Sequence, residues 1–379
     1  MFDRDQSVNP AARVDRRSGG DRRGAFRGGR RASDLARAGV AALALPIAML
    51  AAPDAPSAQQ APPFDDIGAA AARPGVMRFG LPMDGLQKAA ATGVPMDFGV
   101  FWTGSWTQKY GWGYAEENLK AARAKKITPI VHWWYWGDDI SSACVQRGCA
   151  DDRQNVWKDR ATWYRMTREL GSVIRKTMGG RETIVVVEVE FNKGGIERYE
   201  PFDGYLLDQI VELHRVPGVK VVLGLGNWGL EHWGRFNRAG AAADFVGTQL
   251  LRSSVRDANR YLQAVDTLVS GAAQLRQTFR KPSLIIDLAL SSYPSAGYEA
   301  HQATVVRKVF ERVGELKALG VTGIVWRSLV DDPAFDTSNY HGKAERHWGL
   351  LRANGSTKPA FRFFVDGIRR EAATQLSLR

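Results

Sequence analysis

The stretch TIVVVEVEF at residues 183–191 decides the fold. Its first five residues are all β-branched, which is the composition of a strand that is buried on both faces. Such strands belong to parallel sheets whose two faces are covered by helices. Glu188 and Glu190 follow at the end of this run, where a buried charge without a partner would be costly. The stretch therefore predicts a buried parallel strand that ends at a polar site.

Seven further strand-like runs lie along the chain, and amphipathic helical segments separate most of them. The runs are VMRFGL from residue 76, MDFGVFWT from 96, ITPIVHWW from 127, VKVVLGLG from 219, ADFVGTQLL from 243, SLIIDLAL from 283 and TGIVWRSL from 322. Their mean spacing of roughly 35 residues is that of repeated strand–helix units. Eight such units in roughly 250 residues predict an α/β fold, a single (β/α)8 TIM barrel. The alternative, a doubly wound open sheet, has no G-x-G-x-x-G motif after its first strand.

The chain divides by composition into a leader and a folded domain. Of its 379 residues, 44% are hydrophobic and 24% charged, as in folded soluble proteins. Residues 1–37 hold ten arginines and few apolar residues, so we expect a disordered basic tail there. Residues 38–58 begin with the apolar run AGVAALALPIAMLAA at 38–52, which predicts a signal peptide or a membrane anchor. Residues 59–73 are a predicted linker, and residues 74–379 the barrel.

This leader implies an exported protein, periplasmic or secreted, or one anchored to the inner membrane by residues 38–52. In an oxidising compartment Cys144 and Cys149 would form a disulfide that closes a small loop, with two free thiols as the alternative. The net charge is +12, but much of it lies in the tail, so nucleic acid is not an expected partner. The remaining positive charge permits an acidic polysaccharide. The sequence does not indicate an oligomeric state.

The two glutamates of the first stretch are the first candidate site residues. Residues two apart on a strand share a face, so Glu188 and Glu190 are both expected to point towards the barrel axis. The intervening valines would then face the helices: Val185, Val187 and Val189. Proximity and aliphatic walls would raise the pKa of one such carboxyl, which suits a proton donor near neutral pH. The structural alternative is that one glutamate pairs with an inward basic residue.

A third carboxylate lies on the strand from residue 283. Alternation places Ile285, Asp287 and Ala289 on the inward face, and Asp287 is the sole ionisable residue of LIIDLALSS at 284–292. Functional residues of (β/α)8 barrels lie at the carboxyl ends of the strands, so we expect Asp287 to face Glu190 across the axis. The structural alternative is a carboxylate that accepts N–H bonds and holds a loop.

Three segments resemble the clan A glycoside hydrolases. VVEVEFNKGG at 186–195 is similar to their fourth strand with its terminal glutamate, and KPSLIIDLALSSY at 281–293 looks like their seventh-strand segment. The most specific part is GIVWRSLVDDPAFD at 323–336 followed by HWGLLRANGSTKPAFRFF at 347–364, which is similar to their C-terminal pattern. The resemblance spans roughly residues 183–366 and implies a (β/α)8 glycosidase.

In this chain, the resemblance implies that Glu190 is the acid/base and Asp287 the nucleophile. It also implies that Trp326 is the aromatic residue on which the sugar ring stacks in the subsite. Two residues depart from the clan pattern: Val189 stands where Asn is usual, and the nucleophile is Asp rather than Glu. A retaining pair is ~5–5.5 Å apart, and a wider gap would admit water and lead to inversion. Glu188 is the reserve acid.

Further residues at the predicted strand ends are expected to bind sugar. Aromatic faces suit the apolar faces of pyranose rings, while His and Asn can bond hydroxyl groups. The candidates are Trp102, His132, Trp133, Trp134, Asn192, Asn227, Trp228, Tyr293 and Trp326. The alternative for about half of the tryptophans is packing in the core.

Other chemistries have little support in the sequence. The six histidines show no H-E-x-x-H spacing, so we expect no catalytic metal, and no motif indicates a cofactor. The expected function is therefore retaining hydrolysis of a β-linked polysaccharide or oligosaccharide. The alternative is a barrel that binds glycan without cleaving it.

Overall fold

The computed structural model describes residues 76–135, 156–192, 195–253, 257–294, 296–335 and 341–377. The predicted tail, apolar run and linker lie outside these residues, as do Cys144 and Cys149. Within the described part of the chain, no helix has both the length and the apolarity required to cross a membrane.

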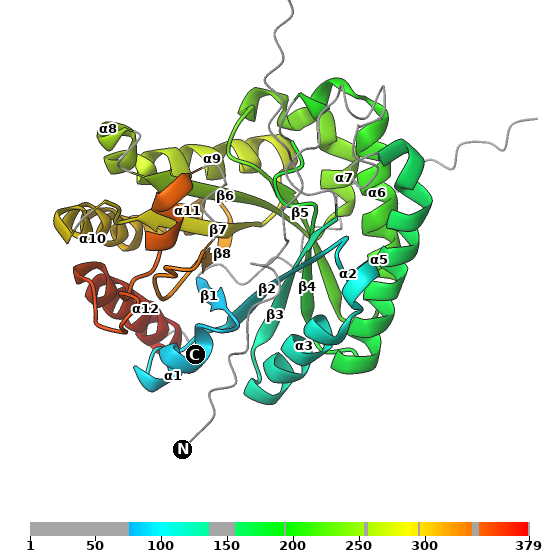
Figure 1. The fold of residues 1–379 in the computed structure, drawn as a ribbon. Coiled ribbons are helices and arrows are strands. Elements are labelled where there is room, and N and C mark those ends of the chain that lie inside the picture. The colour runs from blue at the N-terminus through cyan, green and yellow to red at the C-terminus, as the bar shows by residue number, and fades with distance from the viewer. Residues whose placement is uncertain are drawn as a thin grey trace, which may run out of the picture. The chain divides into compact units, whose positions relative to one another are not determined.

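Eight strands form a closed barrel, as Figure 1 shows. Each strand pairs in parallel with its neighbours in the sequence, and β8 pairs with β1. The strands are β1 (Arg78–Pro82), β2 (Phe98–Gly104), β3 (Thr128–Trp134), β4 (Thr183–Val187), β5 (Val219–Leu225), β6 (Phe245–Ser253), β7 (Ser283–Ser291) and β8 (Val321–Trp326). The predicted (β/α)8 fold is confirmed.

Helices surround the strands, with α3, α5 and α6 on one side of the barrel and α10, α11 and α12 on another (Figure 1). The α-helices are α1 (Leu86–Ala91), α2 (Thr107–Tyr110), α3 (Gly113–Lys125), α5 (Val156–Met178), α6 (Pro201–His214), α7 (Asn237–Ala242), α8 (Ala258–Leu262), α9 (Ala264–Phe279), α10 (Ala296–Glu311), α11 (Val313–Ala318) and α12 (Pro359–Ser377). In the described ranges, 3-10 helices lie in the loops at η3 (Ile196–Arg198), η4 (Leu230–Phe236) and η5 (Gly342–His347).

The core has an inner and an outer layer because strand residues alternate between the axis and the helices. The inner layer is a cluster that includes Val100, Ile130, Ile184, Val186, Val222, Leu284 and Val325. Outside the strands, one cluster joins β2–β6 to α3, α5 and α6. A second outer cluster joins β1, β7 and β8 to α9, α10 and α12. The barrel interior is thus filled by packed side chains.

The end of β4 departs from the predicted alternation. Glu188 and Glu190 have φ angles of +49° and +64°, in the left-handed region that non-glycine residues rarely adopt. These angles turn the chain out of the strand. Val189 consequently joins the inner layer instead of facing the helices. The expectation that Glu188 and Glu190 continue one strand face is therefore wrong.

β7 also departs from simple alternation, through a β-bulge. Thr248 pairs with Ile285 and Gln249 with Asp287, so β7 has one more residue than β6 at this point. Ile286 therefore packs in the inner layer while Ile285 faces outward, contrary to prediction. The bulge shifts the alternation by one residue, and Asp287 still reaches the interior, where it is 2% exposed.

The C-terminal segment is held by Lys358, which is buried at the start of α12. Its Nζ donates to Asp331 Oδ1 at 2.7 Å, to Ser292 Oγ at 2.8 Å and to Gly349 O at 2.8 Å. A Cβ at Gly349 would lie 2.2 Å from Asp331 N, so this close approach requires glycine. Lys358 thereby joins the loops that follow β7 and β8.

Candidate active site

Glu190 and Asp287 lie at the end of the barrel where the strands have their carboxyl ends, and each has a polar partner from another strand. Gln249 of β6 donates a hydrogen bond through Nε2 to Glu190 Oε1. Arg327 donates through Nη1 to Asp287 Oδ2 and forms an ion pair with it. Arg327 follows β8 directly, and its backbone N donates to Leu288 O of β7 at 3.0 Å. Residues that follow β4 and β8 thus join residues from the middle of β6 and β7 in one polar cluster, which we call the mouth cluster: Glu190, Gln249, Asp287 and Arg327.

Electrostatics at Asp287 combine opposing effects. Burial raises the pKa of Asp287 to about 6, and the charge of Glu190 adds to this rise. The positive charge and hydrogen bond of Arg327 oppose it. An interaction between the two carboxylates is what a two-carboxylate mechanism requires. With a pKa of about 6, Asp287 is mostly ionised at neutral pH and protonated in mild acid.

Arg327 lies over two aromatic rings. Its guanidinium carbon lies 5.4 Å from the ring centroid of Trp102 and 4.8 Å from that of Trp348, within the range of cation–π attraction. Burial disfavours its charge, but Asp287 and then Glu190 outweigh this effect and raise the pKa of Arg327. Its side chain is 23% exposed, so this fixed cation can still be reached from the mouth.

His132 lies beside this cation at the end of β3. Its ring centroid is 4.4 Å from that of Trp102, and the imidazole is almost fully buried. Burial, together with the charge of Arg327, lowers the pKa of His132 to about 3, so the ring is neutral at physiological pH. Among the described residues neither ring nitrogen has a hydrogen-bond partner. Both nitrogens are closed to solvent, so a neutral donor and a neutral acceptor stand buried beside the ring of Trp102 and the guanidinium of Arg327.

Trp134 shares this side of the barrel. Its ring centroid lies 5.5 Å from that of Trp102, and both rings are half-buried against the inner layer. Strand alternation from Ile130 accounts for the inward position of His132 and Trp134. The structure thus brings together three of the predicted sugar-binding residues, Trp102, His132 and Trp134, next to Arg327.

Glu188 occupies a different place from Glu190. It is 1% exposed, and its Oε1 accepts a hydrogen bond from the backbone N of Tyr135 at 3.1 Å. Its own backbone N donates to Trp133 O at 2.8 Å. Glu188 therefore fastens the end of β4 to the end of β3, and its reserve role as an acid stays a prediction.

Two predicted sugar-binding residues do not lie in the mouth. Trp133 is fully buried in the outer layer, where its Nε1 donates to Thr167 Oγ1 of α5 at 3.0 Å. Trp326 packs outside β8, with its ring centroid 5.4 Å from that of Phe364 of α12. Strand parity explains both positions, since Val325 and not Trp326 faces the axis. The predicted sugar contacts of Trp133 and Trp326 are therefore wrong.

Asn192 has a structural role instead of the predicted sugar contact. Its Nδ2 donates to Gly226 O at 3.1 Å and to Trp228 O at 3.0 Å, and its Oδ1 accepts from Gly226 N. The amide of Asn192 therefore holds the loop that follows β5 in place through hydrogen bonds. These bonds use both the amide nitrogen and the amide oxygen of the buried side chain, so the predicted sugar contact of Asn192 is wrong.

Three other predicted residues lie in loops that follow the strands. Asn227 is half-buried after β5, and Trp228 beside it is 37% exposed. Tyr293 is half-buried after β7, with its ring centroid 5.3 Å from that of His347. These positions stay compatible with contact to a bound glycan.

Arg327 and Trp348 were not predicted as site residues. Alternation from Val325 would have found Arg327, because residues two apart share a face and Arg327 is the sole charged residue of TGIVWRSL. Trp348 lies in the C-terminal segment and contacts Arg327. No local sequence pattern predicts this contact. Within the described ranges, no group of three or more His, Cys, Asp or Glu could hold a metal ion.

Comparison with known proteins supports the fold. No family model and no curated protein matches the sequence. A GH5_18 from Bifidobacterium longum subsp. infantis is similar in structure, with a TM-score of 0.57 and 14% identity over 78% of this chain and 79% of that one. The exo-β-1,4-mannosidase Op5Man5 from Opitutaceae bacterium strain TAV5 gives a TM-score of 0.60 and 13% identity over 80% of this chain and 61% of that one.

A third similar structure is the GH26 β-mannanase BoMan26A from Bacteroides ovatus. Its TM-score is 0.54, with 13% identity over 79% of this chain and 90% of that one. At such low identity these similarities establish a shared (β/α)8 fold. The chain has the barrel architecture on which these glycoside hydrolases are built.

Proposed function

We propose that the protein is a glycoside hydrolase that cleaves a β-linked polysaccharide or oligosaccharide in the mouth of the barrel. The observation that carries the proposal is that Glu190 and Asp287 belong to one charged cluster, in which Arg327 pairs with Asp287 and the charge of Glu190 raises the pKa of Asp287. Functional groups of (β/α)8 enzymes gather at the carboxyl ends of the strands. The fold that the chain shares with an exo-β-1,4-mannosidase and a β-mannanase supports the same proposal.

In the proposed reaction Asp287 is the nucleophile. Its ionised carboxylate attacks the anomeric carbon while the glycosidic bond to the leaving oxygen breaks. The bond from Arg327 occupies Oδ2, so the attack is assigned to Oδ1. Arg327 keeps Asp287 ionised and later stabilises it as the leaving group when water cleaves the covalent intermediate.

Glu190 is the proposed acid/base. It donates a proton to the leaving oxygen in the first step and takes one from the attacking water in the second. The amide of Gln249 fixes the position of its carboxyl group. This assignment makes the overall reaction proceed with retention at the anomeric carbon.

Trp102, Trp134 and His132 form the proposed sugar subsite. The two indole rings offer apolar surface to a pyranose ring, and the unpartnered nitrogens of His132 can bond a hydroxyl group. A neutral imidazole both donates and accepts, which suits a hydroxyl.

Product analysis on a panel of β-linked glycans tests the proposal, with the wild-type protein beside Glu190→Gln. We expect the wild type to release oligosaccharides and the variant to release at least ~100-fold less, the usual contribution of a positioned acid/base. Arg168→Gln, an exposed change on α5, is the matched control. Equal release by the wild type and Glu190→Gln would refute the role of Glu190.

One observation favours a second candidate function, glycan binding without cleavage. The ion pair between Arg327 and Asp287 occupies the position of the nucleophile. If this ion pair keeps Asp287 from attacking the sugar, the barrel would bind a glycan without cleaving it. Calorimetric binding of a glycan that the wild-type protein does not cleave would favour this second function.

A further inference from the structure

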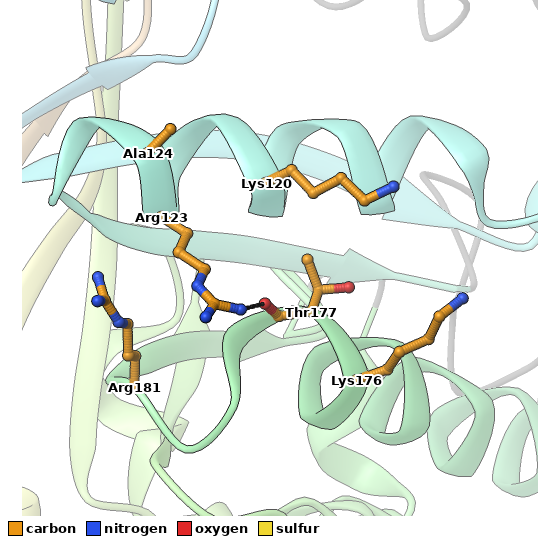
Figure 2. A pocket seen from close by; sticks show the side chains of 6 residues that line it. All are labelled: Lys120, Arg123, Ala124, Lys176, Thr177 and Arg181. Carbon is orange, nitrogen blue, oxygen red and sulfur yellow. Dashed lines mark hydrogen bonds between the residues drawn. The ribbon is translucent and has the colours of Figure 1, made fainter.

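The opposite end of the barrel carries a basic hollow. It measures about 440 Å³ and lies between the C-terminal ends of α3 and α5. Figure 2 shows Lys120 and Arg123 of α3 beside Lys176 of α5, with Arg181 in the turn before β4. These helix ends lead directly into β3 and β4, so the hollow lies where strands begin and the mouth lies where they end.

The cations around this hollow form a wider surface, which we call the basic face: Lys120, Arg123, Lys125, Lys126, Arg175, Lys176 and Arg181. All seven are exposed. The two segments that hold them, residues 116–127 and 175–182, contain only three acidic residues: Glu116, Glu117 and Glu182. The basic face therefore has a local excess of positive charge.

Most of these cations have no acidic partner. Lys120 and Lys176 share Glu116, at 3.7 and 3.3 Å, and Glu182 pairs with Arg78 at 3.0 Å. Arg123 and Arg175 donate only to backbone carbonyls, those of Thr177 and Arg215. In the part of the chain that the structure describes, no ion pair involves Lys125, Lys126 or Arg181. Attraction to helix C-termini does not explain Arg181, which lies beyond α5.

The chain enters the barrel at this same end. β1 begins at Arg78, whose guanidinium donates to Glu182 Oε1 at 3.0 Å and to Thr128 Oγ1 at 2.8 Å. Thr128 and Glu182 lie at the starts of β3 and β4, next to the basic face. In the sequence, the apolar run at 38–52 precedes β1 by 25 residues. The first described strand therefore begins at the basic end of the barrel.

We propose that the basic face docks on an anionic lipid surface, with the mouth turned away from it. Long Lys and Arg side chains at the ends of helices reach headgroups easily, and the negative potential of acidic lipids attracts them within about a Debye length, ~10 Å. The run at 38–52, the predicted membrane anchor or export signal, precedes β1 in the sequence, and β1 begins at the same end as the basic face. This inference is independent of the proposed glycosidase activity.

Two full-length variants of equal charge test the proposal. The basic-face variant combines Lys125→Gln, Lys126→Gln, Lys176→Gln and Arg181→Gln. The control combines Lys109→Gln, Arg198→Gln, Arg235→Gln and Arg260→Gln, four exposed cations in short helices that follow strands at the mouth end. The leader is identical in all proteins, so a difference between variants reports the barrel surface.

The measurement is co-sedimentation with vesicles of phosphatidylglycerol and phosphatidylcholine, and with phosphatidylcholine alone. We expect the basic-face variant to bind the anionic vesicles at least about tenfold more weakly than the wild type, and the control to match the wild type within about twofold. Unchanged binding of the basic-face variant would overturn the proposal. An equal loss in both variants would also overturn it, because net charge alone would then decide binding.

Two further measurements keep the test decisive. Hydrogen exchange of the wild type on anionic vesicles should slow in peptides from 116–127 and 175–182 and not in 196–198, and no slowing in the first two would contradict docking. Binding to soluble polygalacturonate identifies the rival partner. If the basic-face variant loses binding to this polymer but keeps binding to vesicles, the basic face recognises acidic polysaccharide instead of lipid.

Discussion

The two ends of the barrel use charge in opposite ways. At the mouth, Asp287 is buried and pairs with Arg327, and Gln249 bonds Glu190. At the amino end, the cations of the basic face are exposed and mostly lack acidic partners. A buried charge interacts strongly and shifts the pKa of its neighbours, whereas an exposed charge is screened by water. We therefore expect substitutions at the mouth to change activity or the free energy of unfolding strongly. Substitutions at the amino end should change the free energy of unfolding only slightly.

The largest effect is expected for Asp287→Asn. Asparagine has nearly the same shape but cannot act as an anionic nucleophile, and the change leaves the half-buried Arg327 without its ion-pair partner. We expect kcat to fall by ~10³-fold or more, measured as release of reducing sugar from a glycan that the wild type cleaves. Arg168→Gln should retain wild-type turnover. A kcat within about tenfold of the wild type for Asp287→Asn would mean that another group attacks the sugar.

A large loss of stability is expected for Lys358→Met. The change leaves Asp331 buried without the ammonium that contacts it at 2.7 Å. Breaking a buried pair in this way costs about 3–5 kcal/mol of unfolding free energy. Chemical denaturation followed by circular dichroism measures this loss. A loss below about 1 kcal/mol would show that Asp331 finds another partner or becomes protonated at little cost.

An intermediate effect on pH dependence is expected for Arg327→Gln. The wild-type Asp287 loses its proton with a pKa of about 6, so activity that needs its ionised form should fall as the pH drops below about 6. Arg327 favours the ionised form, so its removal raises the pKa of Asp287 further. The acidic limb of kcat/KM should therefore move to higher pH. An acidic limb that stays in place would indicate that a different group controls it.

The smallest effect is expected for Lys176→Gln at the amino end. Its contact with Glu116 spans 3.3 Å, and the lysine side chain is 74% exposed. An exposed pair of this kind contributes about 0–1 kcal/mol, so the unfolding free energy should change by less than ~1 kcal/mol in the same denaturation experiment. A loss comparable to that of Lys358→Met would remove the contrast between the two ends.

The regular spacing of the apolar runs and their residue composition were sufficient to predict the fold. Eight apolar runs at regular spacing indicate a parallel barrel, since each strand must be buried on both faces. Alternation also places His132 and Trp134 correctly, because β3 is regular over its whole length.

The site could be predicted only where the strands stay regular. Positive φ at Glu188 and Glu190 and the bulge before Asp287 interrupt alternation at the two strand ends that carry the carboxylates. No local sequence pattern signals either feature. For β8 the opposite holds: its regular alternation assigns the inward position to Arg327, whereas the resemblance to a family pattern suggested Trp326.

Trapping a covalent intermediate tests the central claim most directly. The wild-type protein is incubated with the 2-deoxy-2-fluoro glycoside of a sugar that it releases, and peptides are examined by mass spectrometry. We predict that the glycosyl group is attached to Asp287, within the peptide that contains residues 283–291. Attachment to any other residue would contradict the assignment of Asp287 as nucleophile, as would turnover with inversion and no adduct.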